Sequence, residues 1–143
     1  MKTSVIILLF ALLSKSSSAQ SYIKLTLNNK LVGKAVVPDQ APITFEVPIN
    51  KYKNIKSLIV EYILKEPMDV YKKNIEIAGD NDVMIAGTNE ESLKPLRLAV
   101  SSNSLLKKIY HQKTLKLYII LNPRNPMMSM PSRKNLLAEV HFK

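Results

Sequence analysis

The chain of 143 residues contains no cysteine and no tryptophan, three glycines and two histidines. Without cysteine it has no disulfide framework, no thiol nucleophile and no Cys-ligated zinc or iron–sulfur cluster. Three scattered glycines leave no phosphate-cradling loop, and two histidines are too few for a His-rich metal centre. These absences exclude several classes of enzyme, and we expect no cofactor and no resident metal.

The first 19 residues have the features of a secretory signal peptide. Lys2 supplies a positive charge, residues 5–13 form an apolar run of nine residues, and a stretch of small residues ends at Ala19, before a cleavage site. Nine residues cannot span a bilayer, which needs about 20, and no later apolar stretch reaches that length. We therefore expect a periplasmic or secreted protein without a transmembrane span, whose mature chain is a single domain, residues 20–143.

The composition of the mature chain favours a bacterial envelope or secreted protein. Small extracellular domains often depend on disulfides, whereas a chain of about 120 residues has room for a sufficient hydrophobic core. No Asn-x-Ser/Thr glycosylation sequon occurs in the sequence.

Positive charge is concentrated toward the C-terminus. Residues 20–93 hold nine basic and ten acidic residues, whereas residues 94–143 hold ten basic residues and Glu139 alone. This asymmetry favours an anionic ligand such as an acidic polysaccharide, although a solvated face that only aids solubility is the alternative. The candidate contacts with such a ligand are Lys107, Lys108 and Lys113. Because the basic residues are mostly lysines and no nucleic-acid motif is present, we expect no nucleic-acid partner.

Alternation of apolar and polar residues recurs along the chain, which is typical of half-buried strands. Residues 55–64 are apolar on both faces, as in a strand at the centre of a sheet, and Asn28-Asn29 and residues 79–82 suit tight turns. The segments with the strand pattern are 23–27, 31–37, 43–49, 55–64, 70–77, 83–86, 96–100, 115–121 and 138–142.

One segment departs from this pattern. Residues 101–104 offer helix caps, and apolar residues follow at helical spacing, which predicts a short helix at about 105–111. About eight strands and one helix predict an all-β fold, a two-layer antiparallel β-sandwich of immunoglobulin-like architecture. The cysteines and tryptophan typical of antibody domains are absent, so the likeness concerns architecture only.

The most distinctive segment is residues 122–133, NPRNPMMSMPSR, which is expected to be a loop between two strands. It holds three prolines, which stiffen it, and three of the six methionines. Exposed apolar groups rimmed by polar ones often mark sites of protein interaction. Two alternatives are that the methionines pack back over the edge of the sandwich or that their thioethers bind Cu(I). The predicted partner-binding residues are Arg124, Met127, Met128, Met130, Arg133 and Lys134.

No catalytic residues are predicted from the sequence. Glu139 and His141 share a face of the last strand and are interpreted as a solvated pair. Residues 80–82, with Glu90 and Glu91 nearby, are rich in oxygen ligands but lack the complete calcium-loop signature, so we interpret them as a turn. For a glycan ligand, the available aromatic platforms are Tyr22, Tyr52, Tyr62, Tyr71, Tyr110 and Tyr118.

The leading functional hypothesis is an exported, non-enzymatic binding module of the bacterial envelope. It would contact a protein or an anionic polymer through the 122–133 loop and the basic C-terminal half. The alternative is a small exported hydrolase whose carboxylates are brought together only by the fold. A converging pocket of titratable groups would favour the hydrolase, whereas dispersed acidic residues would favour the binding module.

Overall fold

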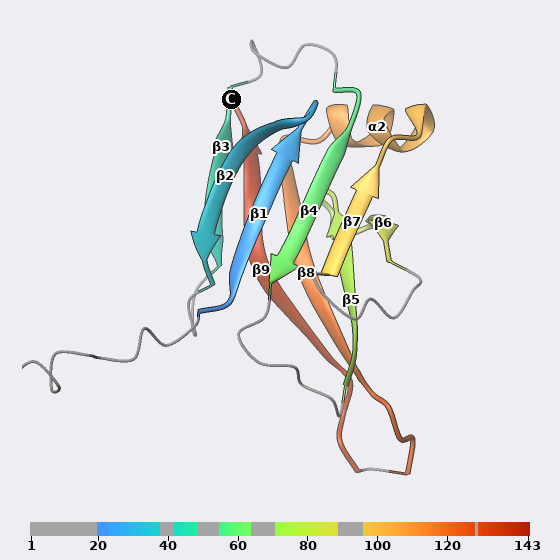
Figure 1. Ribbon diagram of the computed structural model, residues 1–143. Helices are drawn as coiled ribbons and strands as arrows, with labels where there is room; N and C mark the ends of the chain where they lie inside the picture. The colour runs from blue at the N-terminus through green and yellow to red at the C-terminus, as the bar shows by residue number, and fades with distance from the viewer. Residues whose placement is uncertain (1–19, 38–41, 49–54, 64–70, 89–95, 128) are drawn as a thin grey trace, which may run out of the picture.

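A computed structural model describes residues 20–37, 42–48, 55–63, 71–88, 96–127 and 129–143. In these residues the chain forms nine strands and one helix, and the strands make two packed sheets (Figure 1). The predicted all-β sandwich with one short helix is therefore confirmed. The predicted signal peptide lies outside the described residues.

The first sheet has four strands in the order β2-β1-β4-β7, and all neighbours are antiparallel. Its central strand β4 buries alternate residues and half-buries the others, as its apolar sequence predicts. Asn28 and Asn29 join β1 to β2 with φ angles of 48° and 62°, the left-handed turn that Asn tolerates. The strands are β1 (Tyr22–Leu27), β2 (Lys30–Val36), β4 (Leu58–Ile63) and β7 (Leu96–Val100).

The second sheet has five strands in the order β3-β9-β8-β5-β6. Its pairs are antiparallel except at one edge, where β3 runs parallel to β9. The β8–β9 hairpin has strands of ten residues and projects beyond the four-stranded sheet, at the bottom of Figure 1. The strands are β3 (Ile43–Val47), β5 (Tyr71–Ala78), β6 (Met84–Gly87), β8 (Thr114–Pro123) and β9 (Arg133–Phe142).

The hydrophobic core lies between the two sheets and follows the alternation in the sequence. On β8, for example, the buried residues are Leu115, Leu117, Ile119 and Leu121. One side of the sandwich is closed by Gly33 of β2 and Phe45 of β3. A Cβ atom at Gly33 would lie only 2.6 Å from the Phe45 ring, so the absence of a side chain makes room for that ring.

Strand β9 starts at Arg133, five residues before the predicted strand. Arg133 and Lys134 pair with Leu121 and Ile120 of β8, and the register shifts between Leu117 and Tyr118. A β-bulge of this kind interrupts the two-residue period, so the sequence pattern does not reveal the first half of the strand. The expected loop is shortened to residues 124–132, because Asn122 and Pro123 belong to β8 and Arg133 belongs to β9.

Helix α2 (Asn103–Tyr110) connects β7 to β8. It starts two residues earlier than predicted, because the carbonyl of Ser102 accepts a hydrogen bond from the Leu106 amide at 2.9 Å. Leu106 and Ile109 are buried and attach the helix to the sandwich, and two lysines occupy the last turn, where positive charge stabilises a helix. No helix among the described residues has the length and apolar character needed to cross a membrane.

Candidate functional site

The residues predicted to bind ligands lie at opposite ends of the sandwich (Figure 1). Lys107 and Lys108 belong to α2, and Lys113 lies three residues after its end. The predicted partner-binding residues from Arg124 onward belong to the β8–β9 hairpin, whose loop lies at the far end. The two predicted surfaces are therefore separate and do not form one continuous interface.

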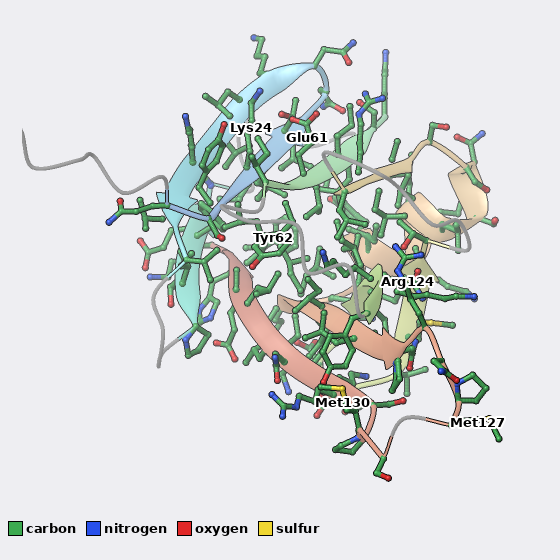
Figure 2. All side chains as sticks on the ribbon, turned by 60° about the horizontal axis from the view of Figure 1, so that its bottom comes forward. Lys24, Glu61, Tyr62, Arg124, Met127 and Met130 are labelled. Atoms are coloured by element: carbon green, nitrogen blue, oxygen red, sulfur yellow. The ribbon has the colours of Figure 1, made fainter. Side chains whose placement is uncertain are left out.

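Folding cancels much of the charge asymmetry along the chain. Within the described part of the chain, four ion pairs join basic residues of the C-terminal part to acidic residues of the N-terminal part. These pairs are Arg97–Glu61, Lys116–Asp82, Lys134–Glu76 and Lys143–Glu46. Figure 2 shows Glu61 beside Lys24, which is its second cationic partner at 3.4 Å. The basic C-terminal half is thus not a uniformly basic surface.

Lys134, a predicted partner-binding residue, already has partners within the protein. Its ammonium group lies 2.5 Å from a carboxylate oxygen of Glu76 and 4.4 Å from the centre of the Tyr118 ring. The Tyr118 hydroxyl donates a hydrogen bond to Asp82 at 2.7 Å. Burial, followed by this hydrogen bond, raises the pKa of Tyr118 to about 12. These contacts give Lys134 a role in joining the strands of the five-stranded sheet.

The acidic cluster at residues 80–82 serves the β5–β6 turn, as the sequence suggests. Asp82 has a φ angle of 57° and accepts hydrogen bonds from Tyr118 and Lys116, which lower its pKa. The Asp80 carboxylate accepts hydrogen bonds from the backbone amides of Lys113 and Thr114 at 3.1 and 2.8 Å. Among the described residues, no three side chains of His, Cys, Asp or Glu form a group that could hold a metal ion.

Glu139 and His141 form the contact expected from their spacing. His141 Nε2 lies 3.1 Å from Glu139 Oε2, and both side chains are about one-third exposed, at 36% and 29%. They are a partly solvated pair on strand β9, consistent with the sequence interpretation.

A pocket of about 470 Å³ lies beside α2. Asn103, Leu106, Lys107 and Tyr110 follow one another at the three- and four-residue spacing that places side chains on one helix face. The described residues of the lining include two lysines and a histidine but no carboxylate. The lining residues are Ile55, Lys56, Asn103, Leu106, Lys107, Tyr110 and His111.

Lys56 is a pocket residue that sequence reasoning missed. Its backbone amide donates a hydrogen bond to the side-chain oxygen of Asn28 at 2.6 Å, and the same oxygen accepts one from Ser57 at 3.2 Å. The backbone amide of Asn28 also donates a hydrogen bond to the backbone carbonyl of Ser57 at 3.0 Å. The β1–β2 turn therefore holds Lys56 beside the helix. The detectable signal is a turn asparagine, but its partner lies 28 residues away in the sequence.

Lys108 lines a second pocket, of about 350 Å³, between the β5–β6 turn and the end of α2. This pocket is more apolar, and its residues Val83 and Met84 are 67% and 61% exposed. The Gln112 side chain joins the two elements, because it accepts a hydrogen bond from the Asp80 amide at 2.8 Å and donates one to the Lys108 carbonyl at 3.3 Å.

The three candidate lysines share the α2 end but differ in their surroundings. Lys107 lines the first pocket, Lys108 lines the second, and Lys113 lies beyond the helix, where its backbone amide is bonded to Asp80. In the part of the chain that the structure describes, no carboxylate forms an ion pair with any of the three ammonium groups.

At the hairpin end, the two described loop methionines differ in exposure. Met127 is 91% exposed and points away from the sandwich, whereas Met130 is 37% exposed and turns back toward it (Figure 2). The alternative that the methionines pack back over the edge of the sandwich is therefore wrong for Met127. Because the two side chains point in different directions, they do not converge as ligands of one copper ion. Met128 lies outside the described residues.

No protein-family model and no curated protein matches this sequence.

Proposed function

We propose that this protein is an exported, non-enzymatic binding module that holds an anionic ligand at the α2 end of the sandwich. The observation that carries this proposal is the pocket beside α2, where Lys56, Lys107 and His111 contribute to the lining and no carboxylate of the described residues does. The apolar N-terminal segment with its small-residue cleavage site supports export.

Within the described residues, the positive charge at the α2 end is not compensated by ion pairs. Elsewhere, Arg97, Lys116, Lys134 and Lys143 are paired with carboxylates. The lysines of α2 have no such partner among the described residues, so their field extends into the adjacent pockets. A surface of one charge sign attracts ligands of the opposite sign and accelerates their association.

The hydrolase alternative receives less support. Each of the six carboxylates that the structure describes accepts a hydrogen bond or belongs to an ion pair. Among the residues that the structure describes, no carboxylate lines the pocket beside α2 or the pocket between α2 and the β5–β6 turn. Acid–base hydrolysis needs titratable groups that converge on a substrate.

Retention on immobilised heparin and polygalacturonate tests the proposal. We expect retention at low salt that weakens steeply toward 0.15 M, where the Debye length is about 8 Å. Replacing Lys107, Lys108 and Lys113 with glutamate should abolish retention. A matched variant with Lys34, Lys72 and Arg133 replaced by glutamate has the same net charge but leaves the α2 end intact, and it should retain most of the binding. Equal loss in both variants would show that only net charge matters.

Contact with a protein partner through the hairpin tip is a second candidate function. It is supported by Met127, whose apolar side chain is 91% exposed on a projecting loop. A few apolar anchors carry most of the binding energy of an interface. An envelope protein that binds the wild type, and binds the glutamate variant of α2 equally well, should be released when Met127 and Met130 are replaced by serine.

Export has a separate test. If residues 1–19 are a signal peptide, N-terminal sequencing of the exported protein should begin at Gln20. An intact Met1 on protein recovered from the periplasm or the medium would contradict the signal-peptide interpretation.

A further inference from the structure

The five described tyrosines differ in whether their rings are accessible to a ligand. Tyr62 and Tyr71 are buried in the core. The ring of Tyr22 is covered by a lysine ammonium group at 4.1 Å, and that of Tyr118 by another at 4.4 Å. Tyr110 is 46% exposed and lines the pocket beside α2. Of the aromatic platforms in the described chain, Tyr110 is therefore the one that combines an exposed ring with the basic pocket.

The polar groups around Tyr110 are complementary to an acidic sugar. Lys56 and Lys107 supply positive charge, and the exposed amide of Asn103 both donates and accepts hydrogen bonds, as sugar hydroxyls require. The Tyr110 ring packs edge-to-face with His111, with the ring centres 6.1 Å apart, so two polarizable rings lie at one edge of the pocket. A phosphate would bind to the lysines without contacting the aromatic ring, whereas a neutral sugar would contact the ring without pairing with the lysines.

We infer that this pocket binds one acidic sugar residue of a polysaccharide. The C–H face of the sugar packs on Tyr110, its carboxylate lies between Lys56 and Lys107, and Asn103 bonds to its hydroxyls. The inference rests on the proposed anion binding at the α2 end and names the class of ligand. The pocket volume of about 470 Å³ falls in the usual range of ligand sites, about 300–1,000 Å³.

Three probes separate charge from ring recognition. Tetragalacturonate has sugar rings and carboxylates, its fully methyl-esterified form has the rings without the charge, and a short inorganic polyphosphate has the charge without the rings. Binding of each to the purified protein is measured by titration calorimetry at one low salt concentration. We expect tetragalacturonate to bind most tightly and the methyl ester to lose most of its affinity.

Variants of the pocket then assign the roles. Tyr110→Ala should weaken tetragalacturonate binding roughly three- to tenfold, the range expected for one aromatic contact, and leave polyphosphate binding unchanged. Tyr110→Phe keeps the ring and should retain binding of tetragalacturonate. Lys107→Gln should weaken both anions, whereas Lys72→Gln on strand β5, which removes the same charge at a site outside the pocket, should weaken neither.

Two kinds of failure can be distinguished. If Tyr110→Ala weakens both anions equally, or neither, sugar recognition is refuted, while dependence on Lys107 keeps the proposed anion site. If neither anion binds the wild type, the proposed function fails and the inference fails with it. Should Tyr110→Ala fold poorly, Asn103→Ala replaces it, because this exposed amide should also affect tetragalacturonate alone.

Discussion

Two neighbouring residues of α2 test how the helix is seated on the sandwich. Ile109 is completely buried, at 0% exposure, whereas the next residue, Tyr110, is 46% exposed. Ile109→Ala removes the side chain beyond Cβ, which costs roughly 2 kcal/mol of transfer free energy at about 0.8 kcal/mol per methylene. The cavity left behind raises the destabilisation to about 2–5 kcal/mol. Tyr110→Ala removes more atoms but from a half-exposed position, and we expect about 1 kcal/mol or less.

Urea denaturation followed by circular dichroism measures both effects. The midpoint should fall clearly for Ile109→Ala and little for Tyr110→Ala, with the slope of the transition unchanged because the fold is retained. In thermal melts, 1 kcal/mol corresponds to roughly 3–6 °C for a domain of this size. The melting temperature should therefore drop by about 6–30 °C in the first variant and by about 6 °C or less in the second.

The order of the two losses is the decisive result. Successive helical residues point about 100° apart, because an α-helix has 3.6 residues per turn. If Tyr110→Ala destabilised the protein as much as Ile109→Ala, the buried face of α2 would be different from the one described. The pocket beside α2 would then not exist in this form, since Tyr110 would be buried against the sandwich.

Three further predictions concern stability. Met127→Ser should leave the melting temperature unchanged and Met130→Ser should lower it slightly, as their 91% and 37% exposures require; a large drop for Met127→Ser would refute the exposed tip. Gly33→Ala should destabilise the protein by about 1–3 kcal/mol in urea, because its Cβ would overpack a buried ring, and an unchanged midpoint would contradict that contact. The Tyr118 phenol should ionise at about pH 12 in an ultraviolet titration of the wild type, and at lower pH in the Asp82→Asn variant. Because this pKa is raised on folding, the stabilisation from Tyr118 is complete below pH 10 and should be lost as pH rises through about 12.

The strands and turns that local sequence determines were predictable. Alternation identifies β8 because each of its inner residues is apolar, and two asparagines identify the β1–β2 turn because few other residues accept a positive φ. The start of β9 was not predictable, because a bulge opposite Leu117 and Tyr118 disrupts the period. The parallel pairing of β3 with β9 was not predictable either, since alternation reports the faces of a strand and not its neighbours.

The candidate site was predictable only where one element supplies it. Lys107 and Lys108 are adjacent on α2, so the sequence alone groups them. Lys56 joins them through a hydrogen bond to a turn 28 residues away, and no local pattern records that contact. The sequence assigns Lys134 to contact with another protein. Its ion-pair residue within the chain, Glu76, lies 58 residues earlier, so no local pattern reveals that contact.

Strand order explains where the positive charge remains uncompensated. In the five-stranded sheet, β8 and β9 from the C-terminal half lie between β3 on one side and β5 and β6 on the other. Basic residues of one half thereby face acidic residues of the other, and Lys134 reaches Glu76 across β8. Helix α2 and the hairpin loop connect strands within the C-terminal half, so neither is interleaved with acidic strands. The lysines of α2 therefore keep their charge uncompensated among the described residues, and charge reversal there is expected to abolish anion binding.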